Sequence, residues 1–417
     1  MEVGNDDAKE NLNGFMLFHQ NGKFLSIGTK EGFNMYQTIP YKGPLKRIFE
    51  GGVAAVEMIG TSNYLILVPN GIPKNNQVII WDDQNQKVVC QYKFNTEVLR
   101  VKCVSNSLYV ICTNNIYLYN SDDLSYVSTI STIPNPNALF AINEKPPIIS
   151  VAVPHHEKEN SLEIYYLPYY EFFHGIATIE KEYKNGFSKI EISSDGALII
   201  TANKDATKFR VHLCYNGNLL QSFERYQSAK LHSICISPDD YVLAVRTSNK
   251  HVHFFSMKRS VDNLKRAEFI IDEPDEPIDI NERRMSVISI NSEEIPKINK
   301  VEEKKEKRKV EIKNVLKEEK KEPENANNKE NQKVIIPKNK KSLLGKILNT
   351  DVEKSFAQIQ LDANESKSII TFLENDLFGV ITSDYKYYTY KMDYADKKDV
   401  TKFDGGVDLL TNKRINK

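Results

Sequence analysis

The sequence predicts an all-β fold of the WD40-like β-propeller type, and three observations support this prediction. Short runs rich in Val, Ile, Tyr, Phe and Leu follow one another over Gly14–Met257, separated by turn sequences and without a long helical period. A plan of polar turn, apolar strand, polar loop and second strand recurs. Two copies that begin at Ser193 and Ser237 start about 44 residues apart, close to the period of roughly 40–45 residues of propeller blades. The pair Trp81-Asp82 ends one of the runs.

The individual strands are predicted from β-branched and aromatic residues that are bounded by turn residues. Turn signals such as Asn21-Gly22 and Asp195-Gly196 stand between the runs, where these residue types favour a reversal of the chain. In order along the chain, the clearest runs are Lys23–Thr29, Tyr64–Val68, Gln77–Trp81, Leu108–Cys112, Ile116–Tyr119 and Ala197–Ala202.

The strand pattern stops after Phe255, and a charged stretch follows over residues 258–354. This stretch has acidic and mixed Lys/Glu runs, few apolar residues and no aromatic residue after Phe269. It therefore buries too little apolar surface to order itself. Strand-like sequence resumes at Ser355–Leu361 and continues to residue 390. The stretch is predicted to be an insertion within one domain rather than a linker between two.

These boundaries divide the 417 residues into one propeller and its appendages. We expect a disordered N-terminus over residues 1–13 and a β-propeller over residues 14–395, interrupted by the low-complexity insertion 258–354. A polar C-terminal tail is expected over residues 396–417. An all-β domain of this length is compatible with a single propeller.

Composition and charge narrow the function classes. The 56 Lys+Arg residues balance 56 Asp+Glu residues, so no net positive charge favours nucleic acid as a partner. The five cysteines form no Cys-x-x-Cys pair, which favours free thiols in a reducing compartment. The polar start of the sequence is unlike a signal peptide. The sequence has no apolar run of about 18 residues, so no membrane-spanning helix is predicted. We expect a cytoplasmic protein whose membrane contact is peripheral.

No motif of the sequence indicates catalysis or a cofactor. The nucleophile-elbow, P-loop and His-Glu-x-x-His patterns are absent. His155-His156 is a pair of potential metal ligands, but its place between Pro154 and charged residues favours an exposed turn over a metal site. The sequence therefore predicts no enzyme, no cofactor and no metal centre.

Five segments of the chain are similar to segments of one protein family. They are Gly51–Met58, Val78–Asp83, Asn115–Tyr119, Thr132–Asn137 and Ser355–Gln358. Through them the chain resembles the PROPPIN family, the seven-bladed phosphoinositide-binding β-propellers of autophagy. The resemblance implies seven four-stranded blades, no catalysis, and two pockets near blades five and six that select 3-phosphorylated phosphoinositides. It also places the insertion in blade six, between the third and fourth strands.

The family motif Phe-Arg-Arg-Gly, whose two arginines serve neighbouring pockets, appears here as Phe223-Glu224-Arg225-Tyr226. Glu224 in place of the first arginine removes a charge-assisted hydrogen bond worth about 1.5–3 kcal/mol and adds like-charge repulsion. Thr207 and Arg210 match the family stretch before the motif, whereas Tyr183 replaces a family histidine. The resemblance therefore implies a disabled first pocket, in which Tyr226 also takes the space that the family leaves to glycine.

The second pocket keeps its arginine, Arg225, whose guanidinium fork suits a phosphate monoester. The residues expected beside it are basic and hydroxyl residues of the next repeat. They are Lys230, His232, Arg246, Thr247, Ser248 and His251. The alternative is that Arg225 is a surface arginine paired with neighbouring carboxylates.

The end of the insertion contains a candidate membrane contact. Leu343, Leu344, Ile347 and Leu348 fall on one helical face with lysines around it, which is the pattern of an interfacial amphipathic segment. In the family this connection inserts into the bilayer. The alternatives are a short helix that docks on the propeller and a segment without structure.

The leading hypothesis is a non-enzymatic effector and scaffold that binds phosphatidylinositol 3-phosphate or 3,5-bisphosphate more weakly than relatives with both arginines. It is expected on autophagosomal-precursor or endosomal and lysosomal membranes. Its expected partners are lipid-transfer or conjugation-machinery proteins of autophagy, and the family's partner-binding loop corresponds to Pro69–Asn76. The alternative is a protein-binding propeller that has lost phosphoinositide recognition.

Overall fold

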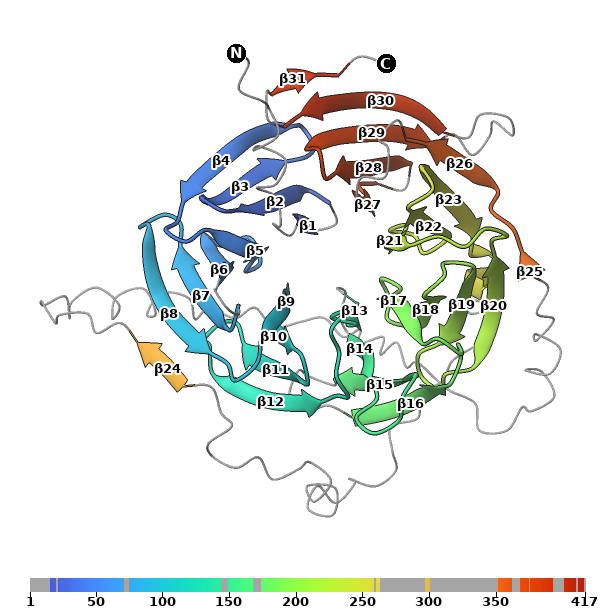
Figure 1. Cartoon of the computed structure of the whole chain (residues 1–417), viewed down its shortest axis with the longest axis horizontal. Coiled ribbons are helices and arrows are strands. Elements are labelled where there is room, and N and C mark those ends of the chain that lie inside the picture. Colours follow the sequence, from blue (N-terminus) through green and yellow to red (C-terminus); the bar gives the residue numbers. More distant parts are fainter. Residues whose placement is uncertain are drawn as a thin grey trace, which may run out of the picture.

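Seven antiparallel sheets surround a common centre in the computed structural model, which confirms the predicted seven-bladed propeller (Figure 1). In every blade except blade six, the four main strands follow one another directly in the sequence. Blade six takes its fourth strand from beyond the insertion. The structure describes residues 16–19, 22–70, 75–143, 149–167, 174–258, 260–262, 297–300, 352–361, 368–374, 376–392, 401–409 and 412–415.

Each of the first four blades is a four-strand meander that runs outward from the centre of the ring. Blade one contains β1 (Met16–His19), β2 (Phe24–Thr29), β3 (Gly32–Gln37) and β4 (Lys42–Ile48), and blade two contains β5 (Val53–Met58), β6 (Tyr64–Pro69), β7 (Gln77–Asp82) and β8 (Lys87–Lys93). Blade three contains β9 (Val98–Val104), β10 (Ser107–Cys112), β11 (Asn115–Asn120) and β12 (Tyr126–Ser131), and blade four contains β13 (Ala141–Ile142), β14 (Ile149–Pro154), β15 (Ser161–Leu167) and β16 (His174–Glu180).

The last three blades follow the same plan and include the insertion. Blade five contains β17 (Phe187–Ile192), β18 (Leu198–Asn203), β19 (Lys208–Leu213) and β20 (Leu219–Glu224). Blade six contains β21 (Leu231–Ile236), β22 (Val242–Thr247), β23 (His251–Ser256) and β26 (Ala357–Gln360). Blade seven contains β27 (Ser368–Phe372), β28 (Leu377–Thr382), β29 (Lys386–Met392), β30 (Thr401–Asp408) and the short β31 (Lys413–Arg414).

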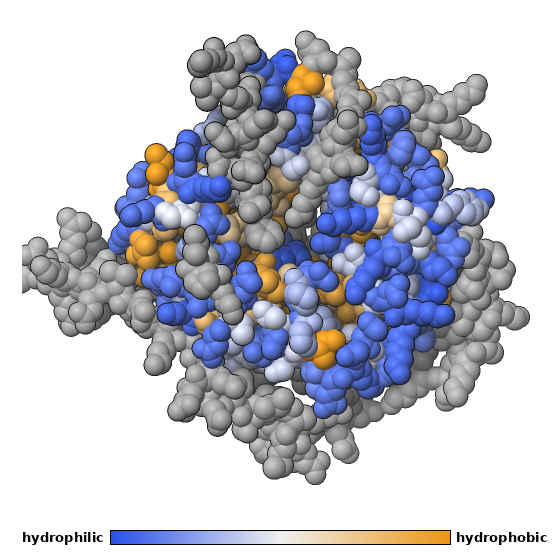
Figure 2. All heavy atoms as spheres, in the orientation of Figure 1, coloured by the Kyte–Doolittle hydropathy of each residue, from blue (hydrophilic) through white to orange (hydrophobic). Residues whose placement is uncertain are grey.

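Apolar side chains fill the spaces between neighbouring blades, while the face of the ring drawn in Figure 2 is mostly hydrophilic. Blade six shows how this arrangement positions side chains. Along β22, Val245 packs with residues of blade five, whereas Ala244 packs with residues of blade seven. Because successive side chains of a strand point to opposite faces, Arg246 is expected on the blade-seven side and Thr247 on the blade-five side.

The ring closes between blades seven and one without exchanging a strand. Leu25 and Tyr36 of blade one form one apolar cluster with Ile381 and Tyr387 of blade seven. Blades one and seven are neighbours in the ring (Figure 1). Closure therefore depends on side-chain packing between the first and last blades.

The structure corrects the prediction of a polar tail over residues 396–417. Thr401–Asp408 is β30, which pairs along its length with β29 as the outer strand of blade seven. Its sequence contains Gly405 and Gly406 and few apolar residues, so it lacks the pattern from which strands were predicted. Pairing with β29 along one edge and with the short β31 at Val407 and Asp408 of the other edge holds this strand, which explains how such a sequence is accommodated.

The structure also places two short strands within the predicted insertion. β24 (Lys297–Lys300) pairs antiparallel with β8, and β25 (Val352–Glu353) pairs parallel with β20. The expectation of no structure over residues 258–354 is therefore wrong at these two places, where outer blade strands offer unpaired backbone groups. Residues 1–13 and the predicted membrane contact at Leu343, Leu344, Ile347 and Leu348 lie outside the described residues.

Candidate anion-binding site between blades five and six

Arg225 directly follows β20, where blade five passes into blade six. Its backbone N–H donates to the carbonyl of Thr207 at 2.8 Å, and its Nη1 donates to the carbonyl of Ala206 at 2.8 Å. Its buried Nε has no hydrogen-bond partner among the described residues. Burial lowers the pKa of the Arg225 guanidinium. The backbone of the β18–β19 turn thus fixes this side chain and leaves one buried donor unused.

Two histidines of β23 lie beside Arg225. His251 and His253 are two residues apart on a strand, so they share one face, and their ring centroids are 6.0 Å apart. His253 is 9% exposed, and its Nδ1 lies 3.4 Å from the hydroxyl of Ser355. Burial, Arg225 and His251 together lower the pKa of His253 from 6.5 to about 4. Arg225 and His251 therefore lie close enough to His253 to disfavour the charged form of its ring.

Several donors of this cluster lack partners within the described part of the chain. They include the buried Nδ1 of His251 and the hydroxyl of Thr247, which is fully buried. A buried cationic group without a counter-charge is costly. No carboxylate among the described residues forms an ion pair with Arg225, so the arrangement suits an anion supplied from outside. Arg225, Thr247, His251 and His253 are called the seam cluster below.

Lys230 and Ser248 lie at the outer edge of the seam cluster. The Ser248 hydroxyl accepts from the Lys230 backbone N–H at 3.1 Å, and the Ser248 N–H donates to the Lys230 carbonyl at 2.9 Å. These bonds join the chain before β21 to the β22–β23 turn. His232 is partly buried on β21, whose Leu231 pairs with Thr247. The predicted residues of this group thus come from one corner of blade six.

Arg246 does not join the seam cluster. It is fully buried, and its Nε donates to the Ser368 hydroxyl of blade seven at 2.7 Å. The strand alternation along β22 turns it to the opposite side of blade six from Thr247. The structure therefore does not bring Arg246 together with Arg225, although the sequence analysis grouped them.

The predicted first pocket is filled by the chain's own groups. Arg210 donates to the Glu182 carboxylate, and its guanidinium carbon lies 5.4 Å from the centroid of the Tyr183 ring. His212 Nε2 lies 3.8 Å from the same carboxylate. The Thr207 hydroxyl accepts from the side-chain amide of Asn203 at 2.9 Å. Arg210 and Thr207 are therefore paired within blade five and its neighbouring loop.

Glu224 and Tyr226 flank Arg225 without contacting its guanidinium. Glu224 pairs across the strands with Lys208, whose Nζ is 3.4 Å from the carboxylate. Tyr226 is 84% exposed, and the Lys354 Nζ lies 5.0 Å from its ring centroid. The interpretation that Tyr226 fills the family's pocket by its bulk is wrong, because its ring extends into solvent.

Two residues important to this geometry were not predicted. His253 was detectable in principle, because it follows a predicted site residue by two positions on a strand and must share its face. Glu182 carries no such signal, because it lies in the loop between β16 and β17 and meets Arg210 only when this loop folds against β18 and β19 of blade five.

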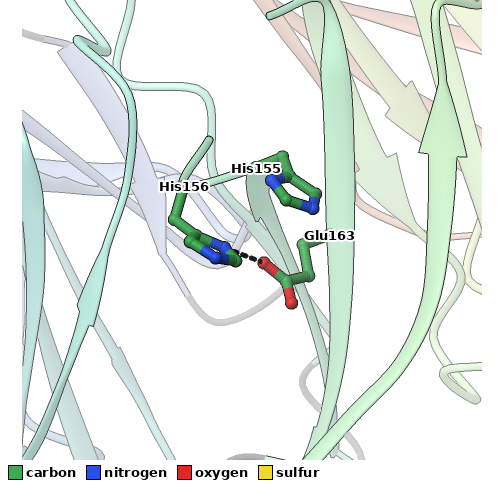
Figure 3. A group of neighbouring side chains, drawn as sticks. All are labelled: His155, His156 and Glu163. Carbon is green, nitrogen blue, oxygen red and sulfur yellow. Dashed lines mark hydrogen bonds and ion pairs between the residues drawn. The ribbon is translucent and has the colours of Figure 1, made fainter. Parts of the chain in front are cut away.

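The pair His155-His156 meets Glu163 on the neighbouring strand (Figure 3). His156 Nδ1 lies 3.1 Å from the Glu163 carboxylate. His155 is buried, so the prediction of an exposed turn is wrong for this residue. Its Nδ1 accepts hydrogen bonds from the backbone N–H groups of Glu157 and Lys158 at 3.0 and 3.2 Å. A neutral imidazole has one acceptor nitrogen, so this bonding leaves no lone pair of His155 for a metal ion. The cluster fits a histidine–carboxylate pair better than a metal centre.

The chain is similar in sequence to one protein family and to individual relatives. The family model described as PROPPIN matches residues 12–270. Autophagy-related protein 18 of Aspergillus terreus is 25% identical over 268 residues, which are 60% of this chain and 64% of that protein. Autophagy-related protein 18 of Saccharomyces cerevisiae is 26% identical over 329 residues, covering 62% of this chain and 65% of that protein. The matched part thus spans less than two thirds of each relative.

Solved structures show the same fold over nearly the whole chain. Hsv2 of Kluyveromyces lactis superimposes with a TM-score of 0.64 at 15% identity, covering 94% of this chain and 98% of that chain. The complex of KlAtg21 with the coiled coil of AgAtg16 gives a TM-score of 0.61 at 13% identity, covering 95% of this chain and 98% of that chain. The seven-bladed ring, together with the family model that matches well over half of the residues, shows that this chain belongs to the PROPPIN family.

Proposed function

We propose that this chain is a non-enzymatic effector that binds a 3-phosphorylated phosphoinositide on a membrane and serves as a scaffold in autophagy or endolysosomal traffic. The observation that carries the proposal is the seam cluster, in which Arg225 and His251 act electrostatically on His253 and no carboxylate of the described residues forms an ion pair with Arg225. Membership of the PROPPIN family supports the choice of ligand. Phosphatidylinositol 3-phosphate and 3,5-bisphosphate are the lipids proposed.

The chemistry of the seam cluster fits a phosphate monoester. Such a group carries between one and two negative charges near neutral pH and presents several acceptor oxygens. The Nε of Arg225, the hydroxyl of Thr247 and the Nδ1 of His251 are buried and have no hydrogen-bond partner among the described residues, so they are the groups proposed to bind the phosphate. A single pocket binds a membrane less tightly than two pockets that act together, so binding is proposed to be weaker than in relatives with both arginines.

Membrane association is proposed to be peripheral. Within the part of the chain that the structure describes, no helix is long and apolar enough to cross a bilayer. The membranes proposed are those where 3-phosphorylated phosphoinositides gather, which are autophagosomal precursors, endosomes and lysosomes.

A protein partner from the autophagy machinery is proposed as well. Relatives are named autophagy-related protein 18, and one structural neighbour is solved in complex with a coiled coil of Atg16. Proteins of lipid transfer or conjugation are the partner classes proposed for this chain. The region Pro69–Asn76 is described at its two ends and lies outside the described residues at positions 71–74.

A propeller that binds proteins but no lipid is the second candidate function. The observation in its favour is the closed first pocket, where Glu182 already neutralises Arg210. A chain that had lost lipid recognition altogether would show this feature too. The seam cluster favours the first candidate, because its donors are not neutralised in the same way.

Liposome flotation tests the proposal. The full chain should float with liposomes that contain phosphatidylinositol 3-phosphate and not with liposomes of phosphatidylinositol alone. Arg225→Ala should weaken this binding tenfold or more, which corresponds to about 1.4 kcal/mol. Arg47→Ala is a matched control, because Arg47 pairs with Asp83 at the junction of blades one and two.

Two results would count against the proposal. A folded chain that floats with neither kind of liposome would favour the protein-binding scaffold. Unchanged flotation of a folded Arg225→Ala variant would show that the lipid binds elsewhere.

A further inference from the structure

Two large hydrophobic side chains are exposed at the rim of the seam cluster. Tyr226 is 84% exposed and Phe356 is 42% exposed. Tyr226 directly follows Arg225, and Phe356 directly follows Ser355, whose hydroxyl lies 3.4 Å from His253 Nδ1. The other exposed large hydrophobic residues of the described chain lie on blades one, two and four. They are Leu45, Ile48, Tyr64, Val89 and Ile176.

Lys354 connects these two aromatic residues. Its Nζ lies 5.0 Å from the Tyr226 ring centroid. From Lys354 to Gln360 the side chains alternate between exposed and covered positions, and this period of two places Lys354 and Phe356 on the same side of the segment. The Phe356 N–H donates to the carbonyl of Phe254 at 2.9 Å. The backbone that carries Phe356 is thereby fixed to β23, so the exposed ring has a defined position.

The composition of this rim matches a membrane interface. Tyrosine favours the boundary between headgroups and acyl chains, because its ring is apolar and its hydroxyl is polar. Lysine extends its ammonium toward lipid phosphates while its stem stays near apolar surface. Such side chains enter the interface by about 5–10 Å. Tyr226 is 84% exposed and directly follows Arg225 in the chain, so its ring is available to a bilayer whose headgroup is bound at Arg225.

We propose that Tyr226, Lys354 and Phe356 form a membrane-contact rim that holds the surface of an anionic bilayer beside the seam cluster. This proposal rests on the proposed function, because the lipid headgroup and the bilayer surface are bound side by side. The rim is distinct from the predicted contact in the insertion, and it uses Tyr226, the residue at which this chain departs from the family glycine. It adds to membrane affinity without touching the phosphate.

Two assays separate the rim from the pocket. The first is calorimetric titration with soluble dibutanoyl phosphatidylinositol 3-phosphate, which offers the headgroup without a bilayer. The second is flotation with liposomes of phosphatidylcholine, phosphatidylserine and phosphatidylinositol 3-phosphate. The double variant Tyr226→Ser/Phe356→Ser should lose roughly tenfold in liposome affinity while its affinity for the soluble lipid stays unchanged. Tyr64→Ser is the matched control, because Tyr64 is 42% exposed on blade two.

A conservative variant excludes a purely structural role. Tyr226→Trp should float at least as well as the original chain, because tryptophan also favours the interface. Its emission should shift to the blue on adding the liposomes and not on adding the soluble lipid. Signal from Trp81 is removed by subtracting the spectrum of the original chain.

Each outcome decides between the claims. The proposed membrane-contact rim is contradicted if the double variant floats like the original chain, or if its affinities for the liposomes and for the soluble lipid fall in parallel. Neither result would contradict lipid binding by the seam cluster. If the original chain binds neither the soluble lipid nor the liposomes, the proposed function fails and the rim fails with it.

Discussion

The Arg210 guanidinium is held by the Glu182 carboxylate, while Arg225, one blade junction away, has no carboxylate partner among the described residues. The sequence resemblance assigns both arginines to predicted phosphate sites. The difference between them is the presence of one acidic side chain in the loop that follows β16. We therefore expect the two positions to respond in opposite ways to mutation.

Arg210→Ala should leave the affinity for phosphatidylinositol 3-phosphate within about twofold, because Glu182 already occupies the guanidinium. Glu182→Gln should instead raise the affinity, because it removes the competing negative charge and frees Arg210 for phosphate. Titration with the soluble lipid measures both variants under one set of conditions. A tenfold loss in Arg210→Ala would mean that the lipid displaces Glu182.

Glu224→Arg should strengthen binding and steepen its dependence on salt. The substitution replaces a repelling charge by a cation beside the seam cluster, and attraction between partly exposed charges is screened by ions. Because Glu224 is paired with Lys208, the change also frees that lysine. Glu224→Gln is the control, and its affinity for the lipid should lie between those of the original chain and Glu224→Arg. Titration with the soluble lipid at low and high salt provides the measurement, and equal affinities at low salt would show that the first pocket is closed for other reasons.

The sequence was sufficient for the fold, and it named Arg225, Thr247 and His251 of the seam cluster, whose role in binding stays a prediction. The blade pattern and the insertion were predictable because strand period, turn residues and composition are local properties. Arg225 and His251 were predictable from the family motif and its flanking repeat. The prediction that Arg246 belongs to this group was wrong. Successive side chains of a strand point to opposite faces, so Arg246 faces blade seven while Thr247 faces blade five.

The remaining differences depend on contacts between distant segments. Glu182 meets Arg210 only when the loop between β16 and β17 folds against blade five. β30 was not predicted, because an outer strand with glycines carries no apolar alternation and is held by its pairing with β29. Local sequence therefore indicates strands that supply core residues more clearly than strands that complete an edge.

The stability of the site should depend on pH through His253. Burial and its positive neighbours lower the pKa of His253 from 6.5 to about 4, so the unfolded chain binds more protons than the folded chain between these values. The free energy of unfolding is highest above pH 6.5, where the histidine is neutral in both the folded and the unfolded chain. It falls as the pH is lowered toward 4, because the unfolded chain binds the proton more readily than the folded chain. With a discount for solvent screening, the loss amounts to roughly 1–3 kcal/mol. His253→Gln should flatten the pH dependence of the urea midpoint between pH 7 and pH 5, and parallel curves would contradict the assignment.

The same histidine links lipid binding to protons. A phosphate beside His253 favours the imidazolium, so binding should take up protons, which calorimetry in two buffers of different ionisation enthalpy detects. The headgroup itself titrates near pH 6 and acts in the opposite direction. The variant His253→Arg measures the contribution of the headgroup alone, because arginine keeps its charge throughout this pH range. Equal proton uptake by the original chain and by His253→Arg would remove His253 from the site.

Phe255→Ala should destabilise the propeller by about 3–5 kcal/mol. The Phe255 ring is fully buried, and its centroid lies 5.7 Å from that of Phe209 and 5.1 Å from that of Phe223. It thus joins blades five and six beneath the seam cluster. Phe356→Ala is the matched control and should cost far less, because that ring is 42% exposed. Urea unfolding compares the two variants, and equal losses would contradict the packing described.

Two deletions should have opposite effects on folding. Replacing residues 263–351 by a short Gly-Ser linker removes β24 but leaves every main strand of the seven blades in place, so a cooperative thermal transition should remain within a few degrees of the original. Removing residues 401–417 takes away β30, which pairs with β29, and Leu409, which packs with Tyr385 and Tyr387. The exposed edge of β29 is then free to pair with other chains, so this variant should unfold at lower temperature and aggregate. Circular dichroism melts and size-exclusion chromatography distinguish the two. A stable, monomeric C-terminal deletion would restore the interpretation of these residues as a tail.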